Sequence, residues 1–157
     1  MRSSSSSGRS GASGGRRRST SSNASSCGTG TATGPLHAVG AGKCLDDPNG
    51  TTTAGTQEQI YTCNGLAPQN WTVNSNGTLT IAGGCMDITG AKYTNGTLIE
   101  LWTCNGGANQ QWTASNGEIV NPHSGMCLDD PASNTTNGTQ LILYACNGGN
   151  NQKWTVP

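Results

Sequence analysis

Short apolar runs, separated by turn residues, fill most of the chain after its first thirty or so positions. The runs are rich in Thr, Ile, Leu, Tyr and Trp, and Asn-Gly pairs punctuate them, as in "NSNGT", "TNGT" and "ASNGE". Asn-Gly and Gly-Gly pairs favour the tight turns of β-hairpins, and no segment keeps a helical period. The pattern predicts an all-β domain of short strands, in which buried and outward-facing side chains alternate.

The pattern recurs three times with a period of about 41 residues. The first cysteine of each unit recurs at this spacing, at Cys44, Cys85 and Cys127. A tryptophan closes each unit, at Trp71, Trp112 and Trp154. Three such units (about 34–73, 74–113 and 114–157) predict threefold pseudosymmetry. With about four strands per unit, we expect a closed β architecture, because closure removes exposed strand edges.

The N-terminal segment differs from the rest in composition. Residues 1–33 contain 12 serines and no Leu, Ile, Val or aromatic residue, so we expect a disordered linker or tail, with the folded domain at 34–157. All five arginines lie in this tail, which leaves three lysines against eight acidic residues in the domain. An acidic domain repels phosphate backbones, which argues against nucleic acid as a partner. No run is long enough to span a membrane.

Six of the seven cysteines form three pairs, each separated by 19 positions. This spacing predicts one local disulfide per repeat: Cys44–Cys63, Cys85–Cys104 and Cys127–Cys146. Reduced cysteines or a metal site are the alternatives, but the close CxxC pairs typical of metal sites are missing. Disulfides indicate an oxidising compartment, so we expect a secreted protein. Because the N-terminus lacks the apolar region of a signal peptide, we expect a fragment or a misassigned start. Cys27 remains unassigned.

The motifs together resemble the ricin-type β-trefoil lectins, or QxW carbohydrate-binding modules, including those appended to bacterial xylanases and arabinofuranosidases. Three features carry the resemblance in every repeat: a C-[LM]-D opening, an aromatic residue two positions before the second cysteine, and a final Q-x-W. The resemblance covers residues 34–157 and implies a β-trefoil with the three Q-x-W tryptophans in its core. It also implies sugar binding through up to three shallow sites.

Each repeat carries groups that suit a sugar: a carboxylate for vicinal hydroxyls, amides for orientation and an aromatic platform. The carboxylates are Asp46, Asp87 and Asp129. The platforms are Tyr61, Trp102 and Tyr144, which we expect to face away from the core because their neighbours Ile60, Leu101 and Leu143 face inward. Turn formation remains an alternative for the aspartates, and cover of the disulfides for the aromatics. Asp47 and Asp130 precede prolines and are interpreted as turn residues.

The polar partners differ between repeats. The Asn-Gln pair before the final Trp is Asn109 and Gln110 in the second repeat, Asn151 and Gln152 in the third, but Pro68 and Gln69 in the first. The family glutamine four residues before the second cysteine is Gln59, Glu100 or Ile142, and we interpret Glu100 as a conservative acceptor. The asparagines after the second cysteine are candidate contacts or turn residues: Asn64, Asn105 and Asn147. We therefore expect sites two and three to bind and site one to be weak.

The sequence predicts a binding module without cofactor, metal or catalytic activity. A glycosidase needs a placed pair of carboxylates, whereas the repeated aspartates belong to separate repeats. We expect a monomer whose ligand is a polysaccharide or a galactose-, xylose- or arabinose-type sugar. In the full-length protein its partner would be an upstream glycoside hydrolase acting on plant cell-wall polysaccharide such as xylan. The alternative function is a trefoil scaffold or inhibitor that acts through protein–protein contacts.

Overall fold

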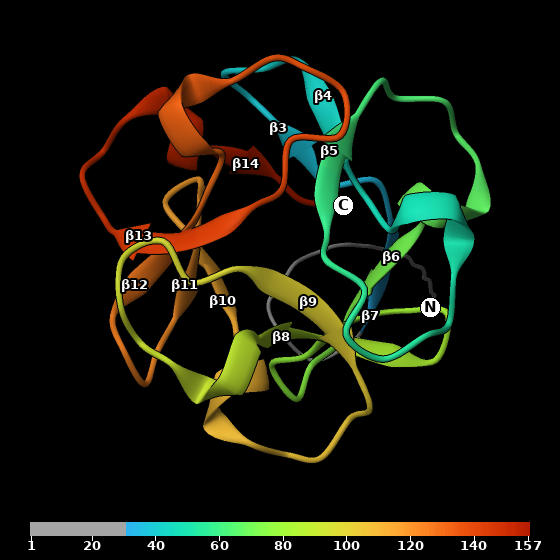
Figure 1. The fold of residues 1–157 in the computed structure, drawn as a ribbon, viewed down its shortest axis with the longest axis vertical. Coiled ribbons are helices and arrows are strands. Elements are labelled where there is room, and N and C mark those ends of the chain that lie inside the picture. Colours follow the sequence, from blue (N-terminus) through green and yellow to red (C-terminus); the bar gives the residue numbers. More distant parts are fainter. Residues whose placement is uncertain (1–30) are drawn as a thin grey trace, which may run out of the picture. The chain divides into compact units, whose positions relative to one another are not determined.

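The computed structural model describes residues 31–157, of which Ala32–Pro157 form one compact unit (Figure 1). The expected disorder of the tail, its arginines and Cys27 fall at or before residue 30 and lie outside the described residues. No helix in the described part of the chain is long and apolar enough to cross a membrane.

The described residues form thirteen short strands in three antiparallel sheets. The first sheet joins β14 (Trp154–Thr155), β3 (His37–Ala38), β4 (Lys43–Asp46) and β5 (Gln59–Tyr61). The second joins β2 (Ala32–Gly34), β6 (Trp71–Val73), β7 (Leu79–Ile81), β8 (Gly84–Ile88) and β9 (Ile99–Trp102). The third joins β10 (Thr113–Ser115), β11 (Glu118–Asn121), β12 (Met126–Asp129) and β13 (Ile142–Ala145). The last strand thus pairs with the first repeat, which closes the domain.

Six short 3₁₀ turns connect these strands. One follows the aspartate-bearing strand of each repeat: η1 (Pro48–Gly50), η3 (Thr89–Ala91) and η5 (Pro131–Ser133). The other precedes each Q-x-W tryptophan: η2 (Ala67–Gln69), η4 (Ala108–Gln110) and η6 (Asn150–Gln152). The two turns of a repeat pack against one another, which brings the Q-x-W segment beside the end of the aspartate strand.

The three repeats meet in a ring of backbone hydrogen bonds. The Glu58 N–H donates to the Ile99 carbonyl at 2.9 Å, Ile99 donates to Leu141 at 3.2 Å, and Leu141 donates back to Glu58 at 3.1 Å. These residues are 41 and 42 positions apart, so the ring of hydrogen bonds marks the pseudo-threefold axis. Figure 1 shows the three lobes arranged around this axis. The fold is the predicted β-trefoil with three pseudo-symmetric repeats.

Equivalent contacts hold each repeat together. The Q-x-W tryptophans belong to the buried core, and their indole Nε1–H groups donate to the carbonyls of Leu45, Met86 and Leu128 at 3.1, 3.0 and 3.1 Å. These bonds satisfy the polar atom that a buried indole carries. The three predicted disulfides are confirmed, each with Cα atoms 5.1 Å apart.

Candidate functional site

Strand register places a carboxylate and an aromatic ring on one face of each hairpin. In the second repeat Asp87 lies opposite Glu100 and Cys85 opposite Trp102, while Met86 and Leu101 face the core. Side chains two positions apart on a strand share a face, so Asp87 and Trp102 line the same outward surface. The first and third repeats have the same register, with Asp46 opposite Gln59 and Asp129 opposite Ile142.

The aromatic platforms project outward, as strand alternation requires. Tyr61, Trp102 and Tyr144 are 41%, 42% and 39% exposed, whereas Ile60, Leu101 and Leu143 are buried. A large aromatic side chain held at a domain surface presents an apolar face to which a sugar ring can stack.

A loop of the neighbouring repeat borders each platform strand. The Ala145 N–H after Tyr144 donates to Asn95 Oδ1 at 2.8 Å, and the Thr62 N–H after Tyr61 donates to Asn137 Oδ1 at 2.9 Å. The equivalent residue beside Trp102 is Ala54, which has no side-chain amide. The loops of neighbouring repeats are thus held beside the strands that carry Tyr61 and Tyr144.

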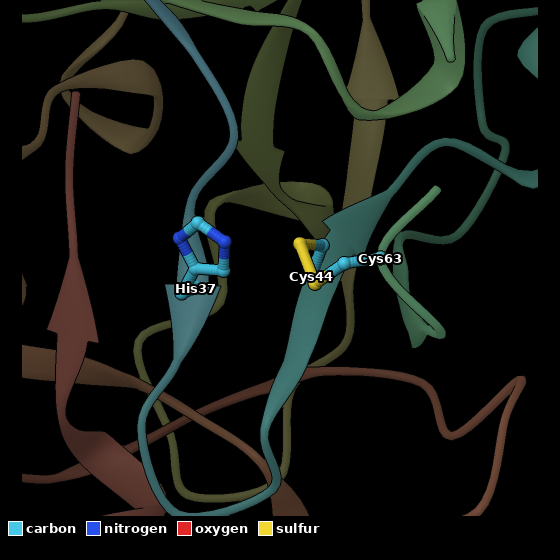
Figure 2. Close-up of side chains that lie close together, drawn as sticks. All are labelled: His37, Cys44 and Cys63. Carbon is cyan, nitrogen blue, oxygen red and sulfur yellow. A yellow bond between two sulfur atoms is a disulfide. The ribbon is translucent and has the colours of Figure 1, made fainter. Parts of the chain in front are cut away.

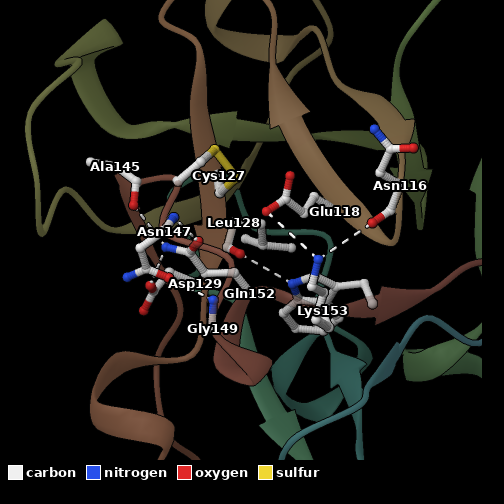
Figure 3. A network of polar contacts seen from close by, with 12 residues as sticks. Asn116, Glu118, Cys127, Leu128, Asp129, Ala145, Asn147, Gly149, Gln152 and Lys153 are labelled. Carbon is white, nitrogen blue, oxygen red and sulfur yellow. Dashed lines mark hydrogen bonds and ion pairs between the residues drawn. A yellow bond between two sulfur atoms is a disulfide. The ribbon is translucent and has the colours of Figure 1, made fainter.

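The Q-x-W glutamines lie beneath the aspartates and use all their hydrogen-bonding groups. In the third repeat Gln152 Nε2 donates to Asp129 Oδ2 at 2.8 Å and to the Ala145 carbonyl at 2.9 Å, and its Oε1 accepts from the Asn147 N–H at 2.8 Å (Figure 3). Gln69 and Gln110 make the equivalent bonds. All three glutamines are at most 2% exposed. Both N–H donors of each glutamine are thus engaged and its buried Oε1 already accepts a backbone N–H, so the side chain orients the aspartate from below.

The asparagine that precedes this glutamine also holds the carboxylate. Asn109 Nδ2 donates to Asp87 Oδ2 and to the Ile88 carbonyl, both at 3.1 Å. Asn151 repeats this with Asp129 Oδ2 at 3.1 Å and the Asp130 carbonyl at 3.2 Å. Both asparagines are partly exposed, so they also border the outward surface. Pro68 takes this place in the first repeat and has no side-chain donor.

The asparagines after the second cysteine form turns. Each Oδ1 accepts the backbone N–H two residues later, at 2.8 to 2.9 Å, in Asn64, Asn105 and Asn147. These are Asx turns, so the Oδ1 atom of each asparagine stabilises its own turn. The three side chains are nevertheless exposed, and Asn147 lines the surface beside Tyr144.

The residue opposite each aspartate distinguishes the three sites. Gln59 Nε2 donates to Asp46 Oδ1 at 2.9 Å. Ile142 cannot donate, and Asp129 Oδ1 accepts no hydrogen bond from the residues that the structure describes. Glu100, interpreted from the sequence as a conservative acceptor, lies directly opposite the carboxylate of Asp87. Burial, followed by the proximity of Asp87, raises the pKa of Glu100 to about 7.

An open depression of about 360 Å³ lies over the third aspartate. Its lining brings the expected groups together: Asp129, Tyr144, Asn147 and Asn151, bordered by Pro131, Ala132 and Ile142. Burial raises the pKa of Asp129, and the bonds from Gln152 and Asn151 oppose this shift by stabilising the carboxylate. The result is an oriented carboxylate with one unused oxygen beside an exposed ring.

Within residues 31–157 two clusters contain metal-ligating residue types, but neither suits a metal. His37 lies beside Cys44 and Cys63 (Figure 2), and Glu118 lies beside Cys127 and Cys146. Both cysteine pairs are disulfides, so they offer no thiolate for coordination.

Three buried acids were not expected from the sequence. Asp47 and Asp130 do precede 3₁₀ turns, but they are buried, as is Glu58. The carboxyl groups of Asp47 and Glu58 face one another, and the oxygens of Asp130 have no hydrogen-bond partner within the described residues. Glu58 occupies the place of Ile99 and Leu141 at the pseudo-threefold axis. Alignment of the three repeats could have revealed this buried acid, because Glu58 stands where the other two repeats have an aliphatic residue.

A β-trefoil with a carboxylate, amides and an exposed aromatic on each repeat defines a lectin-type binding domain. The model of the ricin-type beta-trefoil lectin domain family matches residues 32–154, and the chain belongs to this family. The ricin-type lectin domain is a carbohydrate-binding fold that is generally non-catalytic.

Solved structures show the same fold. The designed threefold symmetric protein ThreeFoil has 30% sequence identity and a TM-score of 0.70, over 78% of this chain and 95% of ThreeFoil. The C-half of the earthworm R-type lectin, solved with GalNAc, has 18% identity and a TM-score of 0.69, over 78% and 95%. The agglutinin from Abrus precatorius has 23% identity and a TM-score of 0.71, over 80% of this chain and 48% of the agglutinin.

Proposed function

We propose that this domain binds galactose-, xylose- or arabinose-type sugars at up to three shallow sites. The third site carries the proposal: Asp129 Oδ1 is unused, the depression above it has a volume of about 360 Å³, and Tyr144 borders it. Vicinal sugar hydroxyls would donate to the carboxylate while the apolar ring face stacks on Tyr144. Asn147 and Asn151 would supply further polar contacts, and Gln152 would position Asp129 without touching the ligand.

The other two sites follow the same design with a few substitutions. Site two would use Asp87, Trp102, Asn105 and Asn109, with Gln110 in the positioning role. Site one would use Asp46, Tyr61, Asn64 and Gln59, with Gln69 beneath. It lacks the amide that Asn109 and Asn151 provide, which supports a weaker first site.

Three weak sites on one rigid body favour a polymer over a free monosaccharide. A polysaccharide that reaches several sites gains avidity without any new contact type. A secreted protein would be consistent with the three disulfides. We infer that the module holds an attached glycoside hydrolase on plant cell-wall polysaccharide such as xylan.

Sugar titrations of single-site variants test the proposal. Asp46→Asn, Asp87→Asn and Asp129→Asn each replace one carboxylate by an amide of the same shape. We expect Asp129→Asn to lower the affinity for lactose or xylo-oligosaccharide by about tenfold or more at the third site, in line with the loss of charge-assisted hydrogen bonds. An unchanged affinity in all three variants would contradict the proposal.

A glycan array and a pull-down on insoluble xylan identify the ligand class. Retention on xylan that free xylo-oligosaccharide competes away would support the accessory-module proposal. Retention on galactose resin alone would support a lectin with a different target. Absence of retention on any glycan would favour the scaffold or inhibitor function instead.

A further inference from the structure

The cross-strand partner of the aspartate changes from repeat to repeat, and in the second repeat it is a second acid. Asp87 and Glu100 are direct register partners on β8 and β9, and they are only 2% and 7% exposed. The equivalent pairs are Asp46 with Gln59 and Asp129 with Ile142. Paired side chains on one face of a sheet are close enough to interact directly.

The first repeat indicates what this position does. Gln59 Nε2 donates to Asp46 Oδ1 at 2.9 Å, while Gln69 Nε2 holds the other carboxylate oxygen at 3.0 Å. Each carboxylate oxygen has two acceptor positions, so the pair of amides orients Asp46 and still leaves room for a hydroxyl. A glutamic acid has nearly the shape of glutamine, but it donates a hydrogen bond only while it carries a proton.

Among residues 31–157, no positive charge contributes to the raised pKa of Glu100. The ion pair in the described part of the chain joins Lys153 to Glu118, away from this site. The groups around the pair are neutral: Asn109 and Gln110 donate to Asp87 Oδ2, and Gln57 bridges to Glu100 through the backbone. The hydroxyl of Thr89 lies beside Glu100 and favours its charged form.

Other acids do not complicate the titration of this site. Ile88 takes the place that Asp47 and Asp130 hold in the other repeats, so the second site has no further aspartate behind it. Glu58, on the segment paired with β9, faces Asp47 and is fully buried. Asp87 is thus the charged group that faces Glu100.

We propose that Glu100 is the positioning residue of the second sugar site and that its proton switches the site on. With the proton, Glu100 donates to Asp87 Oδ1 as Gln59 does to Asp46, which leaves one oriented carboxylate beside Trp102. Without it, two adjacent carboxylates repel, turn apart and carry an extra negative charge where the sugar hydroxyls bind. The first and third sites lack this switch because Gln59 and Ile142 do not titrate. The inference rests on the proposed sugar binding.

The switch is expected to operate near neutral pH. Burial and the Asp87 charge raise the pKa of Glu100 to about 7, so the proton is held below this pH and lost above it. Binding of one sugar to the protonated form predicts an affinity that falls about tenfold per pH unit once the pH exceeds the pKa. The second site would therefore bind sugar in a mildly acidic medium and bind it only weakly in an alkaline one.

Trp102 gives this site its own signal. The other two platforms are tyrosines, and Trp71, Trp112 and Trp154 are buried in the core. Changes of the Trp102 indole N–H resonance during a sugar titration therefore report the second site alone, and Trp102→Tyr assigns the resonance. Titrations with the sugar identified on the glycan array would be run at about pH 5.5, 7 and 8.5 in wild type and in Glu100→Gln.

We expect the wild-type dissociation constant at the second site to rise at least about tenfold between the two extreme pH values. Glu100→Gln should bind at every pH with an affinity near that of the protonated wild type, since it restores the arrangement of the first repeat. Equal pH profiles in the two proteins, tighter wild-type binding at high pH, or loss of binding in Glu100→Gln would each overturn the switch. If no site of the wild type responds to sugar at any pH, the proposed function fails as well.

Discussion

Asp47 and Glu58 pair their carboxyl groups inside the first repeat, where the second repeat has Ile88 and Ile99. Both acids are fully buried, and no other donor of the described residues reaches their oxygens. Burial is the main cause that raises the pKa of Asp47 to about 6 and that of Glu58 to about 10, and repulsion from neighbouring acids adds to both shifts. A proton on Glu58 gives the pair its internal hydrogen bond, so the folded state holds a proton that the unfolded chain releases at neutral pH.

This pair predicts that the domain loses stability as the pH rises. Because both folded-state pKa values lie above the unfolded ones, the favourable contribution is complete below about pH 4 and declines through about 6 and about 10. We expect the free energy of unfolding in urea to fall by on the order of a few kcal/mol between about pH 5 and pH 10. Glu58→Gln should flatten the decline above about pH 8. A wild-type urea midpoint that is constant or increases over this range would contradict the prediction.

Pro68→Asn should strengthen the first sugar site. In the other repeats this position donates from Asn Nδ2 to the carboxylate and to the carbonyl of the next residue, at 3.1 to 3.2 Å. Restoring the two bonds around Asp46 should raise the affinity of the first site roughly fivefold to tenfold, the worth of about one hydrogen bond. Isothermal titration in an Asp87→Asn/Asp129→Asn background isolates this site. The matched change Asn151→Pro should weaken the third site, and an unaltered first site would contradict the prediction.

Gln152→Met should lower both stability and binding at the third site. The substitution keeps the side-chain length but removes three hydrogen bonds, to Asp129, Ala145 and Asn147. Leaving buried groups without partners costs about 1–3 kcal/mol each, so we expect a loss of roughly 2–5 kcal/mol in thermal or urea unfolding. Sugar affinity should fall at the third site and persist at the other two. Equal loss at all three sites would indicate general unfolding instead of a positioning role.

Removal of one disulfide should destabilise the domain without changing its fold. Each bridge closes a loop with a sequence separation of 19, which corresponds to about 3 kcal/mol in the chain-entropy description. Cys85→Ser/Cys104→Ser should therefore reduce the unfolding free energy by roughly this amount, measured by urea denaturation without reductant. The equivalent double variants at Cys44/Cys63 and Cys127/Cys146 serve as controls, since equal spacing predicts a similar loss. A much smaller effect in all three would contradict the stabilising role.

Much of the site geometry follows from the one-dimensional pattern because strand alternation and repeat spacing are local rules. The alternation of Leu143 and Tyr144 was enough to place one side chain inside and the other outside, and equal cysteine spacing was enough to pair the disulfides. The repeated sequence also marked Asp129 and its equivalents as candidate sugar ligands. These inferences needed no knowledge of long-range contacts.

The cross-strand contacts could not be read from the sequence, because they join residues whose proximity is created only when the hairpin forms. In the sequence Glu100 is a conservative replacement of glutamine, whereas the pairing of β8 with β9 places it opposite the carboxylate of Asp87. The sequence marks Gln152 as a candidate sugar contact, and the structure buries its side chain in the η6 turn, where it donates to Asp129.

The sequence by itself determined the all-β class, the three repeats, their disulfides and the outward aromatics, since each depends on spacing along one strand or within one unit. Only the tertiary structure decided which polar atoms remain free for a ligand and which acids are cut off from water. Hydrogen-bond saturation and desolvation depend on every group packed around an atom, and in this domain those groups come from turns and repeats that are distant in the chain.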